Sequence, residues 1–332
     1  MPFEYLRGDA DIHDGRSVAA VLAREAVSCA HAMALAAAHA RGWSRVTAPY
    51  WMARRFGGQL GTPLDSDRVI TQTWSTPGGG RARIALRTNQ SDLIVLWEVF
   101  VHRNYELPEP ISRLDTIVDI GANSGLASAY LAARYRPSTL LAIEPLAENA
   151  AVLRRNAALA DAPWIVEQCA ASSSDGELEF FVSGYWCTAT AVPEVGEHRL
   201  SSPHRIEHAM PRPAVTVPAR TVAALLDEHG IDRVDLMKID IEGGELDLLR
   251  DRPRWLNRVD RLLIEIHDKY IDGAPVRAAL AAAGLQPRSC PHLEDGSPPG
   301  HHQQLFTRDP IGARVIDSRT GTGRLRGHSA PR

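Results

Sequence analysis

From residue 116 onward, short apolar runs alternate with longer segments whose apolar residues recur at helical spacing. The runs predict strands at 116–120, 140–143, 164–170, 233–239, 260–266 and 303–307. The segments between them predict helices at 125–136, 146–158, 221–229, 244–250 and 274–284. Strands that alternate with helices build a mostly parallel sheet with helices on both faces. We therefore expect a doubly wound α/β domain over residues 113–307.

The first 112 residues follow a different pattern and are expected to form an N-terminal extension that covers a pocket. The Ala-rich segment Val18–Ala40 predicts a helix. Two β-rich runs around Pro77–Gly80 predict a hairpin. The apolar stretch 92–106 fits a helix or a strand, and its periodicity does not choose between them. The prolines of 107–115 indicate a linker.

Two further polar segments carry few apolar residues. Residues 183–215 form a polar stretch inside the α/β domain, and we expect this insertion to help the extension cover the pocket. The tail 308–332 is rich in Gly, Arg and Ser and is expected to be disordered.

Composition narrows the class of protein. With 44% hydrophobic and 23% charged residues in 332, the chain can build a packed core. The net charge of −3 gives no support for a nucleic-acid or anionic-membrane partner. The cysteines are far apart and form no CxxC pair, and the N-terminus lacks the basic start of a signal peptide. We therefore expect a cytoplasmic protein with reduced thiols.

The strand at 116–120 runs into a turn with the pattern D-x-G-x-x-x-G, formed by Asp119, Gly121 and Gly125. The turn lacks the dinucleotide fingerprint because Asn123 and Leu126 stand where glycines would be, and no Gly-Lys-Ser/Thr follows. Turns of those two kinds direct backbone N–H groups at phosphates. A carboxylate at Asp119 instead repels phosphate and attracts a cation.

A second acid indicates what the turn holds. Glu144 ends the next predicted strand, 19 residues after Gly125. An acid in this position accepts hydrogen bonds from ribose hydroxyls. A ligand with a ribose, a positive group and no pyrophosphate fits S-adenosylmethionine, and Gly121 lets the backbone approach it closely.

Several blocks in order, among them "IVDIGANSGLASAYLA", "AIEPLAENAAVLRRNAAL" and "VDLMKIDIEGGELDLL", resemble the motifs of FkbM-type methyltransferases over roughly residues 85–307. The resemblance implies a Rossmann-like class I fold with a seven-stranded sheet. It implies S-adenosylmethionine as the methyl donor and a hydroxyl acceptor on a small molecule or sugar. The residues expected to line the cofactor site are Asp119, Gly121, Asn123, Ser124, Gly125, Glu144, Ala170, Ala171, Ser172 and Asp240.

Polar side chains also end the strands at 233–239 and 260–266. Side chains alternate between the faces of a strand. Lys238 and Asp240 therefore share one face of the first strand, and Glu265 and His267 share one face of the second. If these strands are neighbours, Lys238 faces Glu265 and Asp240 faces His267. A buried lysine needs a carboxylate partner, and we interpret Lys238 as half of a structural ion pair.

These residues also carry the candidate chemistry. An alcohol must lose its proton during methyl transfer, and a general base accelerates such steps by roughly 10²–10⁴-fold. His267 is the first candidate for the base, while Asp240 orients it, holds the acceptor hydroxyl or contacts the cofactor. A divalent metal on Asp240, Glu265 and His267, joined by Glu242, is the less favoured alternative, because Lys238 opposes a cation. Glu245 is interpreted mainly as an acid favoured by a helix start.

The sequence therefore predicts a methyltransferase dependent on S-adenosylmethionine that methylates a small-molecule hydroxyl in secondary metabolism. The stretch "DIEG" stands where amino-methylating enzymes place Asn/Asp-Pro-Pro-aromatic, which favours oxygen over nitrogen. N-methylation of a small molecule and a non-catalytic, cofactor-binding partner protein remain the alternatives. No oligomeric state follows from these patterns.

Overall fold

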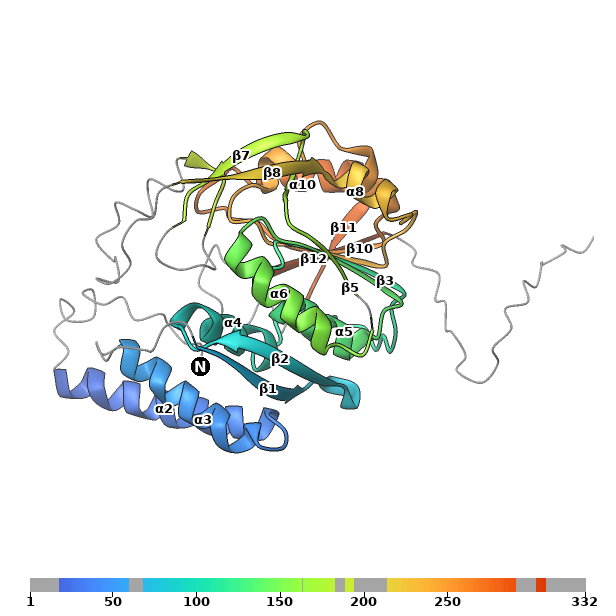
Figure 1. Cartoon of the computed structure of the whole chain (residues 1–332). Helices are drawn as coiled ribbons and strands as arrows, with labels where there is room; N and C mark the ends of the chain where they lie inside the picture. The colour runs from blue at the N-terminus through green and yellow to red at the C-terminus, as the bar shows by residue number, and fades with distance from the viewer. Residues whose placement is uncertain are drawn as a thin grey trace, which may run out of the picture.

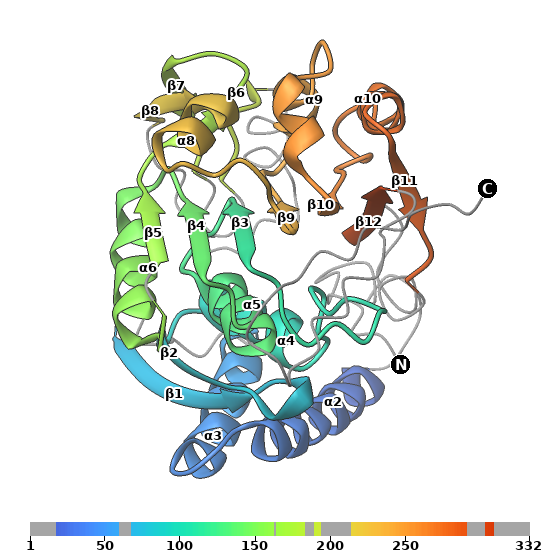
Figure 2. The same ribbon diagram turned by 90° about the vertical axis from the view of Figure 1, so that its right-hand side faces the viewer.

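The computed structural model describes residues 18–59, 68–162, 164–182, 189–193, 214–290 and 303–308. Its centre is a seven-stranded sheet in the order β11-β12-β10-β9-β3-β4-β5 (Figure 2). The strands are β3 Thr116–Ile120, β4 Thr139–Ile143, β5 Trp164–Glu167, β9 Leu236–Ile239, β10 Arg261–Glu265, β11 Leu285–Arg288 and β12 Gln303–Arg308. Pairings among β3, β4, β5, β9 and β10 are parallel, whereas β12 runs antiparallel to β10 and β11. The expected doubly wound, mostly parallel sheet is confirmed.

The strand order reverses between β3 and β9. After β3 the chain adds β4 and β5 on one side, then returns across the sheet to lay β9 on the other side of β3. Ligands in sheets of this type bind outside the carboxyl ends of the strands, at the point where the strand order reverses. Asp119 lies near the carboxyl end of β3, and Asp240 follows β9, so both lie at this point of the sheet.

Helices cover both faces of the sheet (Figure 1). The helices α5 (Leu126–Tyr135) and α6 (Ala147–Leu159) pack on one face, and α8 (Val222–Glu228) and α10 (Ala274–Ala282) pack on the other. Successive strand residues serve opposite cores: Ile117 is buried with α5, whereas Val118 is buried with α8. Burial on both faces explains why these strands read as continuous apolar runs.

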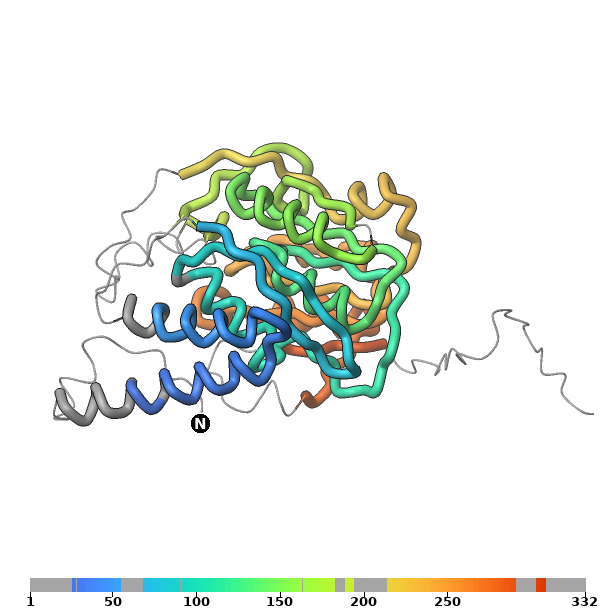
Figure 3. The backbone as a smooth tube through the Cα atoms, turned by 60° about the horizontal axis from the view of Figure 1, so that its bottom comes forward, coloured from blue at the N-terminus to red at the C-terminus, as the bar shows by residue number. Residues whose placement is uncertain are grey.

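The N-terminal part shares a core with the sheet domain. Helix α2 (Val18–His39) and the hairpin of β1 (Val69–Ser75) and β2 (Arg81–Arg87) confirm two predictions. Helix α3 (Ser44–Gln59) was not predicted; it lies beside α2 near the hairpin (Figures 1 and 3).

The ambiguous stretch 92–106 begins as helix α4 (Gln90–Phe100), whose N-cap Asn89 accepts a hydrogen bond from the Asp92 N–H. The rings of Phe100 and Tyr130 on α5 lie 5.5 Å apart in one hydrophobic core. Residues 107–115 form neither helix nor strand, as predicted for a linker.

Several boundaries differ from the prediction. The strand expected at 164–170 is two strands, because β5 ends at Glu167 and β6 (Ala170–Ser172) joins a separate three-stranded sheet with β7 (Gly176–Phe180) and β8 (Val215–Thr221). The helix expected at 244–250 is a single turn, α9 (Glu245–Leu248).

Strand β11 was missed because it is an edge strand with three exposed residues and a proline, which hide the usual apolar alternation. Most of the insertion 183–215, and the tail beyond Arg308, lie outside the described residues. Among the helices that are described, none has the length and apolarity needed to cross a bilayer.

Candidate functional site

The turn after β3 is pinned by two glycines whose φ angles lie in the left-handed region, 76° for Gly121 and 84° for Gly125. A Cβ on Gly121 would lie 1.9 Å from the carbonyl oxygen of Asp240, and a Cβ on Gly125 would lie 2.6 Å from Leu153 Cδ1. The glycines are therefore required by contacts inside the protein, which the sequence motif did not reveal. The turn therefore packs directly against the backbone of Asp240, the first residue after β9.

Glu144 ties this turn to the end of β4. Its Oε2 accepts a hydrogen bond of 2.8 Å from the N–H of Asn123, and its Oε1 accepts bonds from Leu146 N at 3.0 Å and Asn149 Nδ2 at 3.1 Å. Burial raises the pKa of Glu144, although these hydrogen bonds and the charge of Lys238 oppose the rise. A carboxylate has about four acceptor sites, so one remains for a ligand hydroxyl, as the predicted ribose contact requires.

The N-terminal hairpin supports Glu144 from behind. Arg87 of β2 donates from Nη2 to Asn149 Oδ1 at 2.8 Å, and Asn149 in turn donates to Glu144. Asp92 holds the same guanidinium in an ion pair of 2.7 Å that is almost fully buried. The extension thus contributes to the rigidity of the predicted cofactor site.

A buried polar atom marks the same turn. Ser124 is fully buried, and its hydroxyl has no hydrogen-bond partner among the described residues. Buried polar groups normally have a hydrogen-bond partner, which is a protein atom, an ordered water or a bound ligand. On the other side of Glu144, Ala170 packs in one small core with Leu146, and Ser172 is buried in the same strand. The remaining acceptor site of Glu144 and the buried hydroxyl of Ser124 are therefore compatible with a ligand that carries hydroxyl groups.

Asp119 does not lie open at the turn. It is fully buried, its Oδ1 is 3.2 Å from Lys238 Nζ, and its Oδ2 accepts a 2.6 Å hydrogen bond from Ser128. The Lys238 amine also donates to the carbonyl of Gly121 at 2.6 Å. The negative charge of Asp119 is thus already compensated by a residue of the protein.

The expected pairing of Lys238 with Glu265 is wrong, although the expectation of a carboxylate partner is confirmed. Strand β9 lies between β3 and β10, and the register sets Lys238 opposite Asp119 on β3 and opposite Leu263 on β10. Burial alone lowers the pKa of Lys238, but the charges of Asp119 and Asp240 outweigh it and raise that pKa.

His267 lies at the end of β10 among carboxylates and is 1% exposed. Its Nδ1 is 3.0 Å from Glu245 Oε1, and its Nε2 is 3.3 Å from Glu242 Oε2 and 3.6 Å from Glu265 Oε1. Burial lowers the pKa of His267, but its contacts with Glu242 and Glu245 outweigh burial and raise it. Oxygen atoms of Asp240 and Glu242 and a ring nitrogen of His267 lie within 4.8 Å of one another. The structure therefore brings Asp240 and His267 into one cluster, together with Glu242 and Glu245.

Asp240, the first residue after β9, is partly exposed, as is Glu242 in the same cluster. The hydroxyl of Tyr105 donates to its Oδ2 at 3.3 Å, and the Tyr105 ring centre is 5.6 Å from Lys238 Nζ. Burial, reinforced by the charge of Glu265, raises the pKa of Asp240 to about 7. Sequence analysis missed Tyr105, because nothing in the segment after α4 shows that it reaches across to β9.

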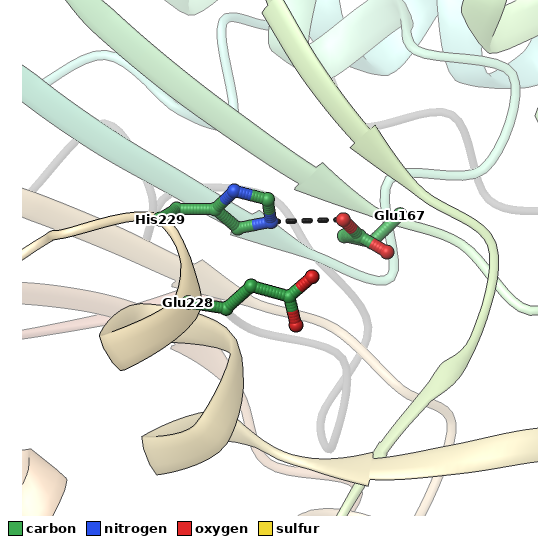
Figure 4. Close-up of side chains that lie close together, drawn as sticks. All are labelled: Glu167, Glu228 and His229. Atoms are coloured by element: carbon green, nitrogen blue, oxygen red, sulfur yellow. Dashed lines mark hydrogen bonds and ion pairs between the residues drawn. The ribbon is translucent and has the colours of Figure 1, made fainter.

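A second group of ionisable side chains joins the end of β5 to the end of α8 (Figure 4). His229 Nε2 is 2.8 Å from Glu167 Oε1, and Glu228 lies close to both. Glu228 is half exposed and pairs with Arg220 at 2.7 Å. Sequence analysis did not identify this group, because Glu167 is far along the chain from the adjacent pair Glu228 and His229.

Comparisons with known proteins identify a family for this chain. Residues 119–286, about half of the chain, match the family model described as the methyltransferase FkbM domain. Methyltransferase sdnD of Sordaria araneosa is 34% identical over 181 residues, which cover 48% of this chain and 68% of that protein. Methyltransferase 1 of Beauveria bassiana is 29% identical over 197 residues, covering 57% of this chain and 78% of that one.

Two further matches carry the FkbM name. The 31-O-demethyl-FK506 methyltransferase FkbM of Streptomyces tacrolimicus is 27% identical over 178 residues, which cover 48% of this chain and 67% of that protein. A crystal structure of methyltransferase FkbM from Methylobacillus flagellatus aligns at 15% identity with a TM-score of 0.40, covering 86% of this chain and 60% of that one.

Proposed function

The chain belongs to the FkbM methyltransferase family and is a methyltransferase dependent on S-adenosylmethionine, and we propose that it methylates a hydroxyl group on a small molecule or a sugar. The observation that carries this proposal is the position of Asp240, partly exposed at the carboxyl end of β9 and next to the turn that Glu144 holds. The relative from Streptomyces tacrolimicus is named as a 31-O-demethyl-FK506 methyltransferase, which supports an oxygen acceptor.

On this proposal the methyl donor binds at the carboxyl ends of β3 and β4, beside β6. Glu144 accepts a ribose hydroxyl at its remaining acceptor site, Ser124 satisfies its buried hydroxyl on the ligand, and the segment Ala170–Ser172 lies along the base. When bound, S-adenosylmethionine supplies a methyl group activated by its sulfonium. Asp119 acts behind this surface, because its ion pair with Lys238 fixes the end of β3 against β9.

The acceptor hydroxyl binds at Asp240. This carboxylate accepts a hydrogen bond from the hydroxyl, orients the acceptor oxygen toward the methyl group and takes up the hydroxyl proton when the methyl group is transferred. Tyr105 restricts its rotation. We assign His267 a positioning role instead of the role of general base, because it is 1% exposed and both ring nitrogens face carboxylates. Tyr105 belongs to the N-terminal extension, so on this view the extension helps to build the acceptor site as well as to cover it.

The test uses a strain that lacks the protein. Its extract is incubated with the purified full-length chain and S-adenosylmethionine carrying a ¹³C-methyl group, and labelled products are analysed by mass spectrometry and NMR. We expect one metabolite to gain a methyl group whose ¹³C shift is that of a methoxy carbon. A labelled N-methyl or C-methyl product would contradict the proposal, and Asp240→Asn should abolish labelling while cofactor binding persists.

A further inference from the structure

The helix pair α2 and α3 carries an apolar outer side. Of the large apolar side chains that the structure describes as exposed, all but Val215 belong to this pair and its connecting turn: Val27, Trp43, Val46 and Tyr50. The pair lies on the side of the β1–β2 hairpin that is turned away from the seven-stranded sheet (Figures 1 and 2). Exposed apolar side chains that gather in one place, instead of being scattered singly, mark an interaction surface.

The exposed side chains of α3 follow the helical period. Trp43, which is 83% exposed, Val46 and Tyr50 stand three and four positions apart, so they form one stripe along the helix. The buried residues Ala48 and Met52 also lie four positions apart and pack into the core that α3 shares with the rest of the protein. The apolar stripe is therefore additional to the side by which α3 is anchored.

Helix α2 is apolar on its outer side as well. Between Ala26 and Ala40 the sequence holds no Asp, Glu, Lys or Arg. Ala32 and Ala36 are buried, whereas the described residues exposed on the opposite side are Ala26, Val27, Ala30, His31, Ala34 and Ala38. A surface helix normally carries charged residues on the side away from the core, and a helix that is apolar all round is normally buried. The outer side of α2 thus has the composition of a covered surface.

We propose that these exposed residues of α2, together with Trp43, Val46 and Tyr50, form the interface of a two-fold symmetric homodimer; we call this surface the helix-pair face. In a two-fold contact both copies use the same patch, which must therefore be complementary to itself. The α2 side of the face meets this condition, because it brings no like charges together and desolvates none. The first 17 residues of the chain match it less well, since six of them are charged.

The pattern of small and large residues fits antiparallel pairing of α2 about a two-fold axis near Ala34. Alanines at every fourth position from Ala26 to Ala38 allow a second helix to approach closely, because helix spacing depends on the side chains at the contact. Val27 lies about 10 Å from Ala34 toward the start of α2, and Trp43 follows its other end. The two-fold operation therefore places the Trp43 end of one copy over the Val27 end of the other.

The same arrangement keeps the arginine at the end of α2 away from its counterpart. Arg41 is seven residues from Ala34, so its two copies are separated by about 20 Å along the helices. This exceeds the screening length of about 8 Å at physiological ionic strength. In addition, Arg41 Nη1 donates to the Ala38 carbonyl at 3.1 Å, so the guanidinium is held at the helix end.

The size of the helix-pair face fits a small specific interface. Helix α2 has 22 residues and α3 has 16, so they are about 33 and 24 Å long and each about 10 Å wide. Their outer sides cover roughly 570 Å² in one copy and about 1,100 Å² in two. Specific interfaces begin at about 1,200 Å² of total buried area. We therefore expect a dimer that dissociates on dilution.

The test is sedimentation velocity of the purified full-length protein over a hundredfold range of concentration. We expect a dimer at the upper end and monomer on dilution. Ala34→Glu keeps a good helix former but sets two like charges beside the axis, so it should weaken dimerisation at least tenfold. The matched control is Ala278→Glu, the same change at an exposed alanine of α10, which lies far from α2 and α3 (Figure 2) and should dimerise like the wild type.

A mixing experiment tests the symmetry. Ala34→Lys alone should also be weakened, whereas Ala34→Glu mixed with Ala34→Lys should form a heterodimer, because opposite charges then meet across the axis. Circular dichroism and thermal unfolding establish beforehand that each variant is folded. A mixture that stays monomeric contradicts the two-fold arrangement.

Two results overturn the inference as a whole. A wild type that is monomeric at every concentration leaves the helix-pair face to the chain's own N-terminal segment or to another protein. A wild-type dimer that persists in Ala34→Glu places the interface elsewhere. The ¹³C-methyl experiment is read separately, so neither result bears on the proposed function.

Discussion

Replacing Asp119 by asparagine should destabilise the protein far more than the loss of an exposed ion pair does. The side chains of Asp119 and Lys238 are 0% and 3% exposed, so the substitution leaves an ammonium group buried without its counter-charge. Breaking a buried ion pair by removing one partner costs about 3–5 kcal/mol. A typical domain has about 5–15 kcal/mol of stability, so this loss is a large share of the total.

Other contacts of Asp119 and Lys238 reduce the expected loss of stability but do not reverse it. Lys238 keeps its hydrogen bond to the Gly121 carbonyl, which solvates part of the charge. Ser128 loses a charged acceptor at 2.6 Å and keeps only an amide oxygen or nitrogen in its place. We therefore expect a loss of about 3 kcal/mol, the lower end of the range for a broken buried pair.

Equilibrium unfolding in guanidinium chloride measures this loss, and a double-mutant cycle attributes it to the pair. Lys238→Met alone leaves the Asp119 charge buried, whereas the double variant buries neither charge. The single losses should therefore exceed the loss in the double variant, with a coupling energy of about 2 kcal/mol or more. The control is Asp115→Asn, in an ion pair whose side chains are 53% and 57% exposed, and its loss should stay below about 1 kcal/mol.

Two results would refute this reasoning. If Asp119→Asn and Asp115→Asn change the unfolding free energy equally little, the buried pair does not exist as described. If Asp119→Asn keeps full stability but loses binding of S-adenosylmethionine in calorimetry, Asp119 is the open cofactor anchor that its motif suggested.

Glu144→Gln should weaken binding of S-adenosylmethionine about tenfold or more in calorimetry, because a hydrogen bond to a charged acceptor is worth about 1.5–3 kcal/mol; unchanged affinity would remove Glu144 from the ribose site. Gly121→Ala should prevent stable folding or displace Asp240, since its Cβ meets a backbone oxygen at 1.9 Å, whereas Gly79→Ala meets nothing within 4 Å and should cost only the left-handed backbone term of about 1–2 kcal/mol in denaturant unfolding. Equal costs for the two would show that the approach to Asp240 is looser than described. Tyr105→Phe should lower kcat about tenfold with an unchanged cofactor Kd, since it removes only the 3.3 Å contact with Asp240, and an unchanged kcat would place that contact outside the reaction. The raised pKa of His267 means that its contribution to stability is fully present below its unfolded value of about 6.5 and is lost as pH rises through the folded value. The difference in unfolding free energy between wild type and His267→Gln should therefore shrink from pH 6 to pH 9, and a difference that grows over this range would contradict the raised pKa.

Prediction from sequence succeeded where consecutive residues carry the signal. Apolar runs buried on both faces marked β3, β4 and β10, and the spacing of Gly121, Gly125 and Glu144 led to a turn that the structure builds at the carboxyl edge of the sheet. Local propensity also sufficed for α2 and for the β1–β2 hairpin. It failed for β11, where exposure and Pro287 remove the alternation on which strand prediction depends.

Partner choice within the site depended on contacts between distant segments. Lys238 was expected beside Glu265, but Asp119 is its partner because β9 has two neighbours and only the packing decides which of them the amine approaches. Tyr105 precedes Asp240 by 135 positions in the chain, and no local sequence pattern predicts that the two residues are in contact. Glu242 has a φ of 57°, an unusual backbone angle that only the surrounding fold can impose.

The sequence by itself determined the class of fold, the glycine turn and the acidic residues that end the strands, because periodicity, turn geometry and residue chemistry are local properties. Only the tertiary structure decided that Asp119 is neutralised, that His267 is enclosed by glutamates and that Asp240 remains accessible. The physical reason is that the charge state and reach of a buried side chain depend on its neighbours in space, and these are set by the order of the strands in the sheet.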